Sequence, residues 1–153
     1  YGKALADDAD YAGKAARISE LALDISTVID AEPLADCLAR DADGQSIAFH
    51  SPCTLQHGQG ITGVVERLLQ SAGYVLQPVT DSHLCCGSAG TYSILQPELS
   101  AQLRDNKLGA LQAGEPAAIA TANIGCLAHM SGHAEVPVRH WIELLEPLLP
   151  EAR

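Results

Sequence analysis

Short apolar segments alternate with amphipathic helical segments along most of this chain, and this alternation limits the fold more than any other feature of the sequence. The segments with the length and composition of strands are residues 46–50, 74–79, 117–122 and 136–138. Helical spacing of apolar residues lies between them, at 61–71 and 98–112. Because strands that alternate with helices form parallel sheets, we expect an α/β fold. It would contain a small parallel sheet of about four strands, with helices on both faces in a Rossmann-like, three-layer arrangement.

Helical segments are expected at both ends of the chain. Residues 10–29 carry a broad apolar face, and a second short helix is expected at 34–39. A last amphipathic helix is expected at 141–149, with its apolar stripe in the core or at a partner interface. We therefore divide the chain into a helical segment, 1–44, that packs on the domain, and an α/β domain, 45–153. The sequence starts without methionine and shows no signal peptide, so we expect it to be part of a longer protein.

Composition excludes several kinds of partner. The chain has 153 residues, 47% of them hydrophobic, which is enough for a core. Its 19 acidic and 9 basic residues give a net charge of −10, which argues against binding to nucleic acid or to anionic lipid. No apolar run approaches the ~18 residues that a membrane-spanning helix needs. An odd number of cysteines, five, without a secretory signal fits a reducing, cytoplasmic compartment.

Four of the five cysteines follow the predicted strands. Cys53 comes three residues after the first strand, Cys85 and Cys86 follow the second, and Cys126 follows the third. Because functional groups in parallel sheets gather beyond the carboxyl ends of the strands, we expect these four thiols to lie at one edge of the sheet. Cys37 is outside this pattern and is expected to be an ordinary, partly buried thiol.

The adjacency of Cys85 and Cys86 favours a site with several metal atoms. Neighbouring Cα atoms are ~3.8 Å apart, whereas an unstrained disulfide needs ~4.4–6.8 Å. The two side chains also diverge too far to share one ion, although one of them could serve a single zinc. They can reach two metal atoms of one cluster. Gly87 would leave room for inorganic sulfur and allow a positive φ.

Histidines supply further candidate ligands. Cys126 and His129 form a C-x-x-H sequence, and positions three apart on a helix share one face, so both could reach one ligand. His50, His57 and His83 are expected to hydrogen-bond a loop or a sulfur rather than to ligate a metal. Of these three, His57 and His83 are the better candidates for a role in the site.

The segments HSPCTLQH, SHLCCGSAGTYSILQPELS, TANIGCLAHM and VRHWIELL resemble the cysteine-rich CCG domain. This domain occurs in one subunit of heterodisulfide reductase and in the iron–sulfur subunit of bacterial glycolate oxidase, whose carboxyl-terminal part is the nearest resemblance. The resemblance implies that Cys53, Cys85, Cys86 and Cys126 bind an iron–sulfur cluster of the 4Fe–4S type. Many relatives end the motif in C-x-x-C, whereas this chain has His129, which leaves the ligand set and the cluster type open.

The resemblance also implies a place in an oxidoreductase. In a glycolate oxidase (2-hydroxy-acid dehydrogenase) complex, a flavin subunit would take the hydride from glycolate. The iron–sulfur subunit, with its other modules, would pass electrons to a membrane acceptor. Such a complex would lie in the cytoplasm, at the inner face of the membrane. This chain alone is not expected to turn over, and its cluster is expected to be sensitive to aerobic purification.

Three other interpretations of the sequence compete with the iron–sulfur site. The first is a structural zinc or subunit-docking module held by Cys53, Cys86, Cys126 and His129. The second is a nucleotide site at the sequence GQGITG, residues 58–63, but seven residues separate it from the strand that it should follow directly. The third is a Cys53–His57 hydrolase, which leaves the CCG sequence without a role.

Overall fold

The computed structural model of this chain describes residues 1–33, 37–39 and 41–150. These residues form two compact units, Tyr1–Pro33 and Leu34–Arg153, which are described separately. The expected packing of residues 1–44 on the domain stays a prediction. The helix expected at 34–39 lies largely outside the described residues. None of the helices in the described ranges combines the length and the apolar character that crossing a bilayer requires.

The first unit contains two helices, so the single helix expected at 10–29 is wrong. Helix α1 spans Ala12–Leu21 and helix α2 spans Ile25–Asp30. The break has a local cause, because the Asp24 carboxylate accepts hydrogen bonds from both the backbone N–H and the hydroxyl of Ser26. A side-chain acceptor that satisfies a first-turn N–H starts a new helix.

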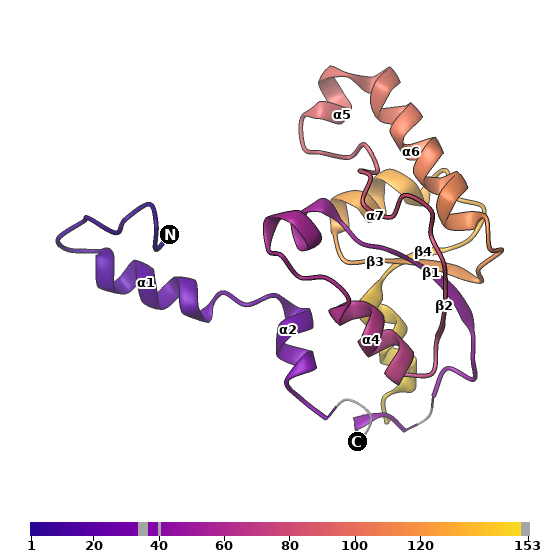
Figure 1. Ribbon diagram of the computed structural model, residues 1–153, viewed down its shortest axis with the longest axis horizontal. Coiled ribbons are helices and arrows are strands. Elements are labelled where there is room, and N and C mark those ends of the chain that lie inside the picture. The colour runs from indigo at the N-terminus through magenta and orange to yellow at the C-terminus, as the bar shows by residue number, and fades with distance from the viewer. Residues whose placement is uncertain (34–36, 40, 151–153) are drawn as a thin grey trace. The chain divides into compact units, whose positions relative to one another are not determined.

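The second unit is built on a four-stranded, all-parallel sheet with the order β2-β1-β3-β4, which confirms the expected α/β fold (Figure 1). The strands are β1 Ser46–His50, β2 Val75–Gln77, β3 Ala118–Thr121 and β4 Val138–His140. Every residue of β3 is buried, as expected for a central parallel strand. Strand β4 begins two residues later than the apolar run at 136–138 suggested.

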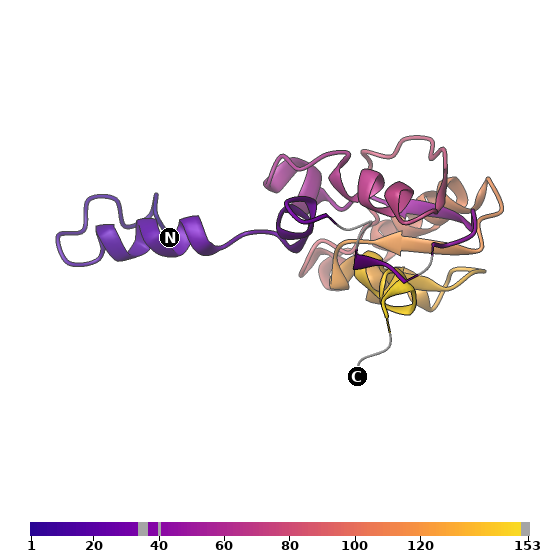
Figure 2. The same cartoon turned by 90° about the horizontal axis from the view of Figure 1, so that it is seen from below.

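Helices cover both faces of this sheet (Figures 1 and 2). Helices α6 (Pro97–Gln112) and α7 (Ile124–Ser131) lie on one face, and α4 (Val64–Ser71) lies on the other. The helix expected at 141–149 is wrong: two 3₁₀ turns, η2 (Trp141–Leu144) and η3 (Glu146–Leu148), lie there instead, on the same face as α4. Pro147 explains the break, because proline lacks the N–H that a continuous helix would need.

The core on the α6 and α7 face reaches directly to the cysteine loops. Its fully packed members are Ala48, Cys86, Leu108, Leu111, Ile119 and Met130. Partly buried Cys126 packs against this cluster. Two of the candidate ligands are therefore held by the hydrophobic core, and only small movements are open to them.

Candidate metal centre

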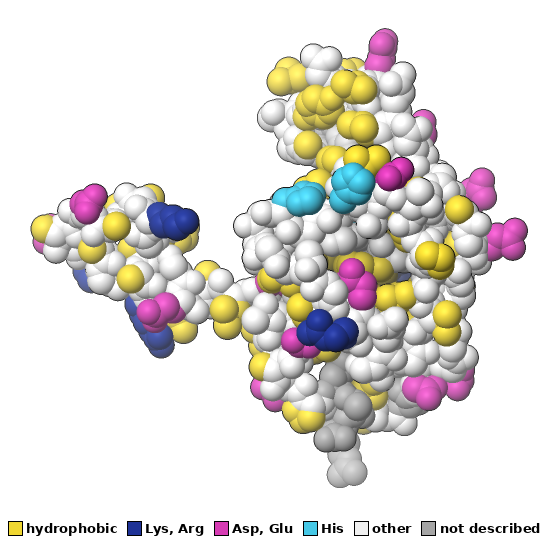
Figure 3. All heavy atoms as spheres, viewed as in Figure 1, with side chains coloured by type: hydrophobic (Ala, Val, Ile, Leu, Met, Phe, Trp, Pro, Cys, Tyr) yellow, Lys and Arg dark blue, Asp and Glu magenta, His cyan; other side chains and the backbone are white. Residues whose placement is uncertain are grey.

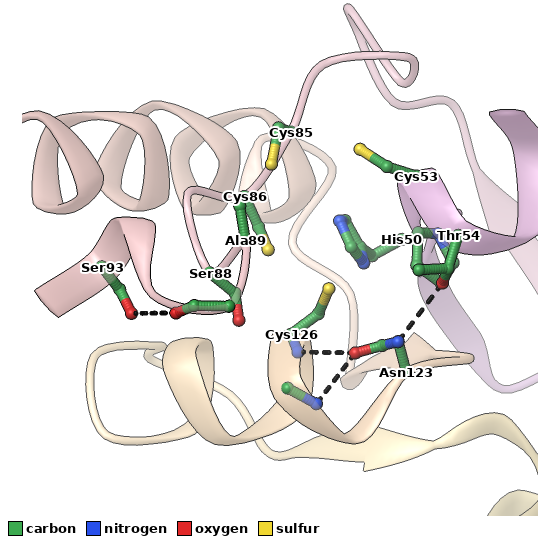
Figure 4. Close-up of a pocket in the computed structure, with 13 residues that line it drawn as sticks. His50, Cys53, Thr54, Cys85, Cys86, Ser88, Ala89, Ser93, Asn123 and Cys126 are labelled. Carbon is green, nitrogen blue, oxygen red and sulfur yellow. Dashed lines mark hydrogen bonds between the residues drawn. The ribbon is translucent and has the colours of Figure 1, made fainter. Parts of the chain in front are cut away.

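A cavity of about 390 Å³ lies beyond the carboxyl ends of β1 and β3. Its lining consists of His50, Pro52, Cys53, Thr54, Cys85, Cys86, Ser88, Ala89, Gly90, Ser93, Asn123, Gly125 and Cys126. The sulfur atoms of all four cysteines in this set point towards a common space (Figure 4). The fold thus brings together thiols that lie far apart in the sequence, from Cys53 to Cys126. Among the described residues, Cys37 lies outside this cavity lining, as expected, but its free thiol is exposed, so the expected partial burial is wrong.

Cys53 is positioned by the turn that follows β1. Pro52 is buried, and its carbonyl oxygen accepts hydrogen bonds from the N–H groups of Leu55 and Gln56. Cys53 immediately precedes the short π-helix η1, Thr54–Gly58. The rigid proline and the tight turn after it fix the direction in which the Cys53 thiol leaves the backbone.

The loop with Cys85 and Cys86 is held against α6 by its glycine. Gly87 has a φ of +87°, and a Cβ there would clash with the carbonyl oxygen of Ser100. The Ser100 hydroxyl donates a hydrogen bond of 2.8 Å to the Gly87 carbonyl oxygen. The Gly87 N–H lies 3.3 Å from the Cys85 sulfur and donates to it. Glycine is therefore required by a positive φ, as expected, and by the close approach of α6 rather than by space for inorganic sulfur.

A buried lysine supports the same loop from α6. The Lys107 side chain donates hydrogen bonds to the carbonyl oxygens of Asp81, at 2.8 Å, and Ser82, at 3.3 Å. Lys107 is 3% exposed, and burial lowers its pKa, while the nearby Cys86 thiolate opposes this effect. Its positive charge lies behind the cysteine loop, where it favours negative charge on the sulfurs.

Cys126 is positioned by the start of α7. The Asn123 side-chain oxygen accepts hydrogen bonds from the backbone N–H groups of Gly125 and Cys126, at 2.8 and 3.2 Å. The Asn123 side-chain amide donates to the Thr54 hydroxyl at 3.2 Å. One asparagine therefore caps the helix and ties the Cys126 loop to the Cys53 loop.

His50 is the site residue whose place the sequence interpretation missed. It is the last residue of β1 and is 2% exposed. A ring nitrogen of His50 and the sulfurs of Cys86 and Cys126 all lie within 4.8 Å of one another. A signal was present in the sequence, because His50 alternates with Ala48 along β1 and so shares its face of the sheet. The sequence alone does not predict which face of the sheet is covered by α6 and the CCG loop.

The other histidines lie away from this group. His129 Nε2 is 3.3 Å from the Ser100 hydroxyl. His57 and His83 are exposed, and His57 Nε2 lies 3.5 Å from the His83 carbonyl oxygen. None of these three histidines lines the cavity within the described part of the chain. The same holds for two glycines of the GQGITG sequence, Gly60 and Gly63, which lie in the turn before α4.

The thiols of the cavity influence one another strongly. The Cys126 thiol hydrogen-bonds to Cys86 and lowers the pKa of Cys86 to about 4, helped by His50 and opposed by burial. The same hydrogen bond and burial raise the pKa of Cys126. Burial, followed by the charge of Cys85, raises the pKa of Cys53. The cavity thus stabilises one thiolate and disfavours a second, unless a cation enters to relieve the repulsion.

The donor set and the size of the cavity fit a polynuclear centre. All five cysteines are free thiols. Thiolate sulfur and imidazole nitrogen are ligands for zinc and for iron–sulfur clusters. A cavity of about 390 Å³ is many times the ~30 Å³ that a single water occupies. The cavity therefore has room for a cluster of several metal and sulfide atoms.

The wall of the cavity next to Ser93 continues into an apolar surface. Helix α5, Tyr92–Leu95, contributes Ser93 to the lining. The next two residues, Ile94 and Leu95, are 76% and 71% exposed. Figure 3 shows hydrophobic side chains gathered over this part of the molecule. The cavity is therefore flanked by an apolar surface on the α5 side.

The sequence of this chain is similar to a known domain family and to several known proteins. The profile of the cysteine-rich domain family, named CCG, matches residues 47–131. The chain is 52% identical to the glycolate oxidase iron–sulfur subunit of Escherichia coli K12 over 149 residues, 97% of the chain and 36% of that protein. It is 30% identical to the probable glycolate oxidase iron–sulfur subunit of Bacillus subtilis 168, over 85% of the chain and 30% of that protein.

A third relative carries a different description. The chain is 31% identical to lactate utilization protein A of Geobacillus kaustophilus over 104 residues, 65% of the chain and 44% of that protein. The chain thus spans between 30% and 44% of the length of these three relatives. The family profile covers more than half of the chain and all four cysteines of the cavity. On this evidence, the chain belongs to the cysteine-rich CCG domain family.

Proposed function

We propose that this chain is an electron-transfer domain whose residues Cys53, Cys85, Cys86 and Cys126 hold an iron–sulfur cluster of the 4Fe–4S type. The observation that carries the proposal is the convergence of four sulfurs, from three strand ends, on one cavity of about 390 Å³. A bound cluster would supply a site that accepts and releases one electron at a time. His129, one helical turn after Cys126, stays a predicted ligand.

The protein's own residues would hold and tune such a centre. Pro52, Asn123 and Gly87 fix the three loops, so that little reorganisation accompanies binding. The Gly87 N–H donates to the Cys85 sulfur, and such hydrogen bonds reduce the charge density on a ligand sulfur. The buried wall around Cys86 and His50 keeps water from one side of the site.

We further propose that the chain acts within a glycolate oxidase complex. Two findings support this proposal. The chain is 52% identical to the Escherichia coli glycolate oxidase iron–sulfur subunit, and it belongs to the CCG family. In this proposal a flavin subunit oxidises the 2-hydroxy acid, this domain and further modules carry the electrons, and a membrane acceptor receives them. The complex would work in the cytoplasm, at the inner face of the membrane. The helical segment 1–44 would pack on the domain formed by 45–153.

A structural zinc or subunit-docking module is the second candidate. The observation that favours it is the compact group of His50, Cys86 and Cys126, whose ligand atoms lie within 4.8 Å of one another. Three ligands this close together can bind one tetrahedral zinc ion. Cys53 or His129 would supply the fourth ligand.

Anaerobic reconstitution separates the two candidates. The chain is incubated with ferrous iron, sulfide and an equal amount of zinc, and is then analysed for metal, acid-labile sulfide and electron paramagnetic resonance (EPR). The proposal predicts iron and sulfide in near-equal amounts and a paramagnetic signal in one oxidation state. One zinc ion per chain, without sulfide and without a signal, would contradict it and establish the second candidate.

A further inference from the structure

His50 is a buried imidazole that faces sulfur atoms. It is 2% exposed, lines the cavity with all four cysteines, and its ring approaches the sulfurs of Cys86 and Cys126 (Figure 4). It is the last residue of a strand rather than part of a loop, and its backbone pairs with Thr121 of the neighbouring strand β3. A side chain on such a rigid element is held in one position before any ligand arrives.

The neighbouring strand fixes the orientation of this ring. Thr121 on β3 is the register partner of His50, and its hydroxyl oxygen lies 2.9 Å from His50 Nδ1. If Nδ1 carries the proton and donates it to this oxygen, the lone pair lies on Nε2. Histidines that bind metals use this arrangement, in which one ring nitrogen is held by a hydrogen bond and the other binds the ion.

No other described histidine has this combination of properties. His129 is engaged with the Ser100 hydroxyl at 3.3 Å, and His57 and His83 are exposed. A neutral imidazole also adds a ligand without adding negative charge. This suits a cavity in which the charge of neighbouring sulfurs already disfavours further thiolates.

From this geometry we infer that His50 is the nitrogen ligand of the metal centre. The inference rests on the proposed function, because it assumes that the four cysteines hold a cluster. It assigns the nitrogen ligand to a different histidine from His129, the residue that the C-x-x-H sequence predicts. One imidazole among thiolates raises the reduction potential of a cluster relative to an all-cysteine ligand set.

Nitrogen hyperfine coupling tests the inference directly. The chain is labelled with ¹⁵N-histidine, reconstituted with iron and sulfide, brought to its paramagnetic state and examined by pulsed EPR. A strongly coupled nitrogen that changes between ¹⁴N and ¹⁵N samples identifies a histidine ligand. We expect this coupling in the wild type and in His129→Ala, and its loss in His50→Ala. Circular dichroism checks that each variant is folded.

A second variant controls for the collapse of the cavity that the loss of the imidazole ring in His50→Ala could cause. His50→Cys keeps a ligand atom at the end of β1, so it should retain iron and sulfide, show no nitrogen coupling and have a lower reduction potential than the wild type. Retention of the coupling in His50→Cys, or its loss in His129→Ala, would overturn the assignment. So would a wild-type cluster with no strongly coupled nitrogen, which would leave the proposed function standing. A wild-type chain that binds no cluster at all contradicts both.

Discussion

Each end of the parallel sheet carries a cavity. The larger cavity is the less suitable one for binding a metal. At the amino end, a cavity of about 660 Å³ is lined by residues that precede the strands, such as Gln45, Tyr74 and Ala117. At the carboxyl end, the cavity of about 390 Å³ gathers four cysteines and a histidine. No cysteine or histidine of the described chain lines the larger cavity. The identity and burial of the donor atoms therefore mark the candidate metal site, and the volume of a cavity alone does not.

The largest effect should come from removing a sulfur of the carboxyl-end cavity. Cys86→Ser removes a buried thiol that we propose as a ligand, and the change of one supporting residue around a metal already costs about 10–100-fold in affinity. We therefore expect bound iron to fall by at least about tenfold. Cys37→Ser is the matched control, because Cys37 is free and exposed, and it should bind as much iron as the wild type. Equal losses of bound iron in both variants would contradict the proposal that the cysteines of the cavity hold the metal.

Two glycines, one at each end of the sheet, separate the effects of backbone strain from the effects of metal binding. Gly87, in the cysteine loop, and Gly73, before β2, have φ values of +87° and +90°. A Cβ at Gly73 would lie 2.9 Å from the Ala42 nitrogen, so alanine is strained at both positions. Each substitution to alanine should lower the free energy of unfolding by about 1–3 kcal/mol.

Metal binding should distinguish these two glycine variants. Gly87→Ala displaces the loop that carries Cys85 and Cys86, so its iron content after reconstitution should fall. Gly73→Ala leaves that loop in place and should bind iron normally while it remains folded. Denaturant unfolding and iron analysis measure the two quantities separately. Normal iron content in Gly87→Ala would show that the cysteine loop need not be in position before the metal binds.

Lys107 offers a smaller effect on the same loop. Lys107→Met leaves the carbonyl oxygens of Asp81 and Ser82 without their donor, which should cost about 1–3 kcal/mol of stability. Loss of the positive charge behind the sulfurs should also lower the reduction potential. Arg104→Met on the same helix is the control, because it also removes a positive charge from α6, but Arg104 pairs with Asp105 and not with the cysteine loop. If both variants release iron at the wild-type rate, Lys107 has no part in holding the loop.

The mildest change to the protein is a titration of the metal-free chain. The pKa of Cys86 is lowered from 9.0 to about 4, chiefly by the Cys126 hydrogen bond. Because the folded pKa lies below the unfolded one, the Cys86 thiolate stabilises the fold fully above pH 9. That contribution is lost as the pH falls through about 4.

Thiolate absorbance in the ultraviolet checks this titration. One thiolate should persist in the reduced wild type down to mildly acidic pH, and it should disappear in Cys86→Ser but not in Cys37→Ser. A wild-type chain that shows no thiolate at neutral pH would mean that the Cys86–Cys126 pair does not share a proton in this way.

Much of the architecture could be predicted from the sequence, because buried parallel strands leave a plain apolar signal. Strand β1 has the predicted bounds, and α6 begins at Pro97, one residue before the predicted start. The errors lie where a local interaction overrides the apolar pattern. The Asp24 cap divides the first helix, and Pro147 replaces the last helix by 3₁₀ turns. Both residues were visible in the sequence as helix-starting or helix-breaking signals.

The candidate site was only partly predictable, for a different reason. The rule that parallel strands end at one edge is sufficient to gather Cys53, Cys85, Cys86 and Cys126. It does not say which side chains of the strands themselves point towards that edge. His50 enters the cavity because α6 packs on the face of β1 that carries Ala48, and this depends on contacts between distant segments. His129 shares a helix with Cys126, yet its ring reaches Ser100.

The central claim is that the sulfurs at the carboxyl end of the sheet hold several metal atoms rather than one. X-ray absorption at the iron edge of the reconstituted chain measures this directly, because it detects neighbouring metal atoms as well as ligands. The account predicts iron surrounded mainly by sulfur, with a clear iron–iron scattering contribution that is absent from Cys86→Ser. A centre with only sulfur and nitrogen neighbours and no second metal would contradict it.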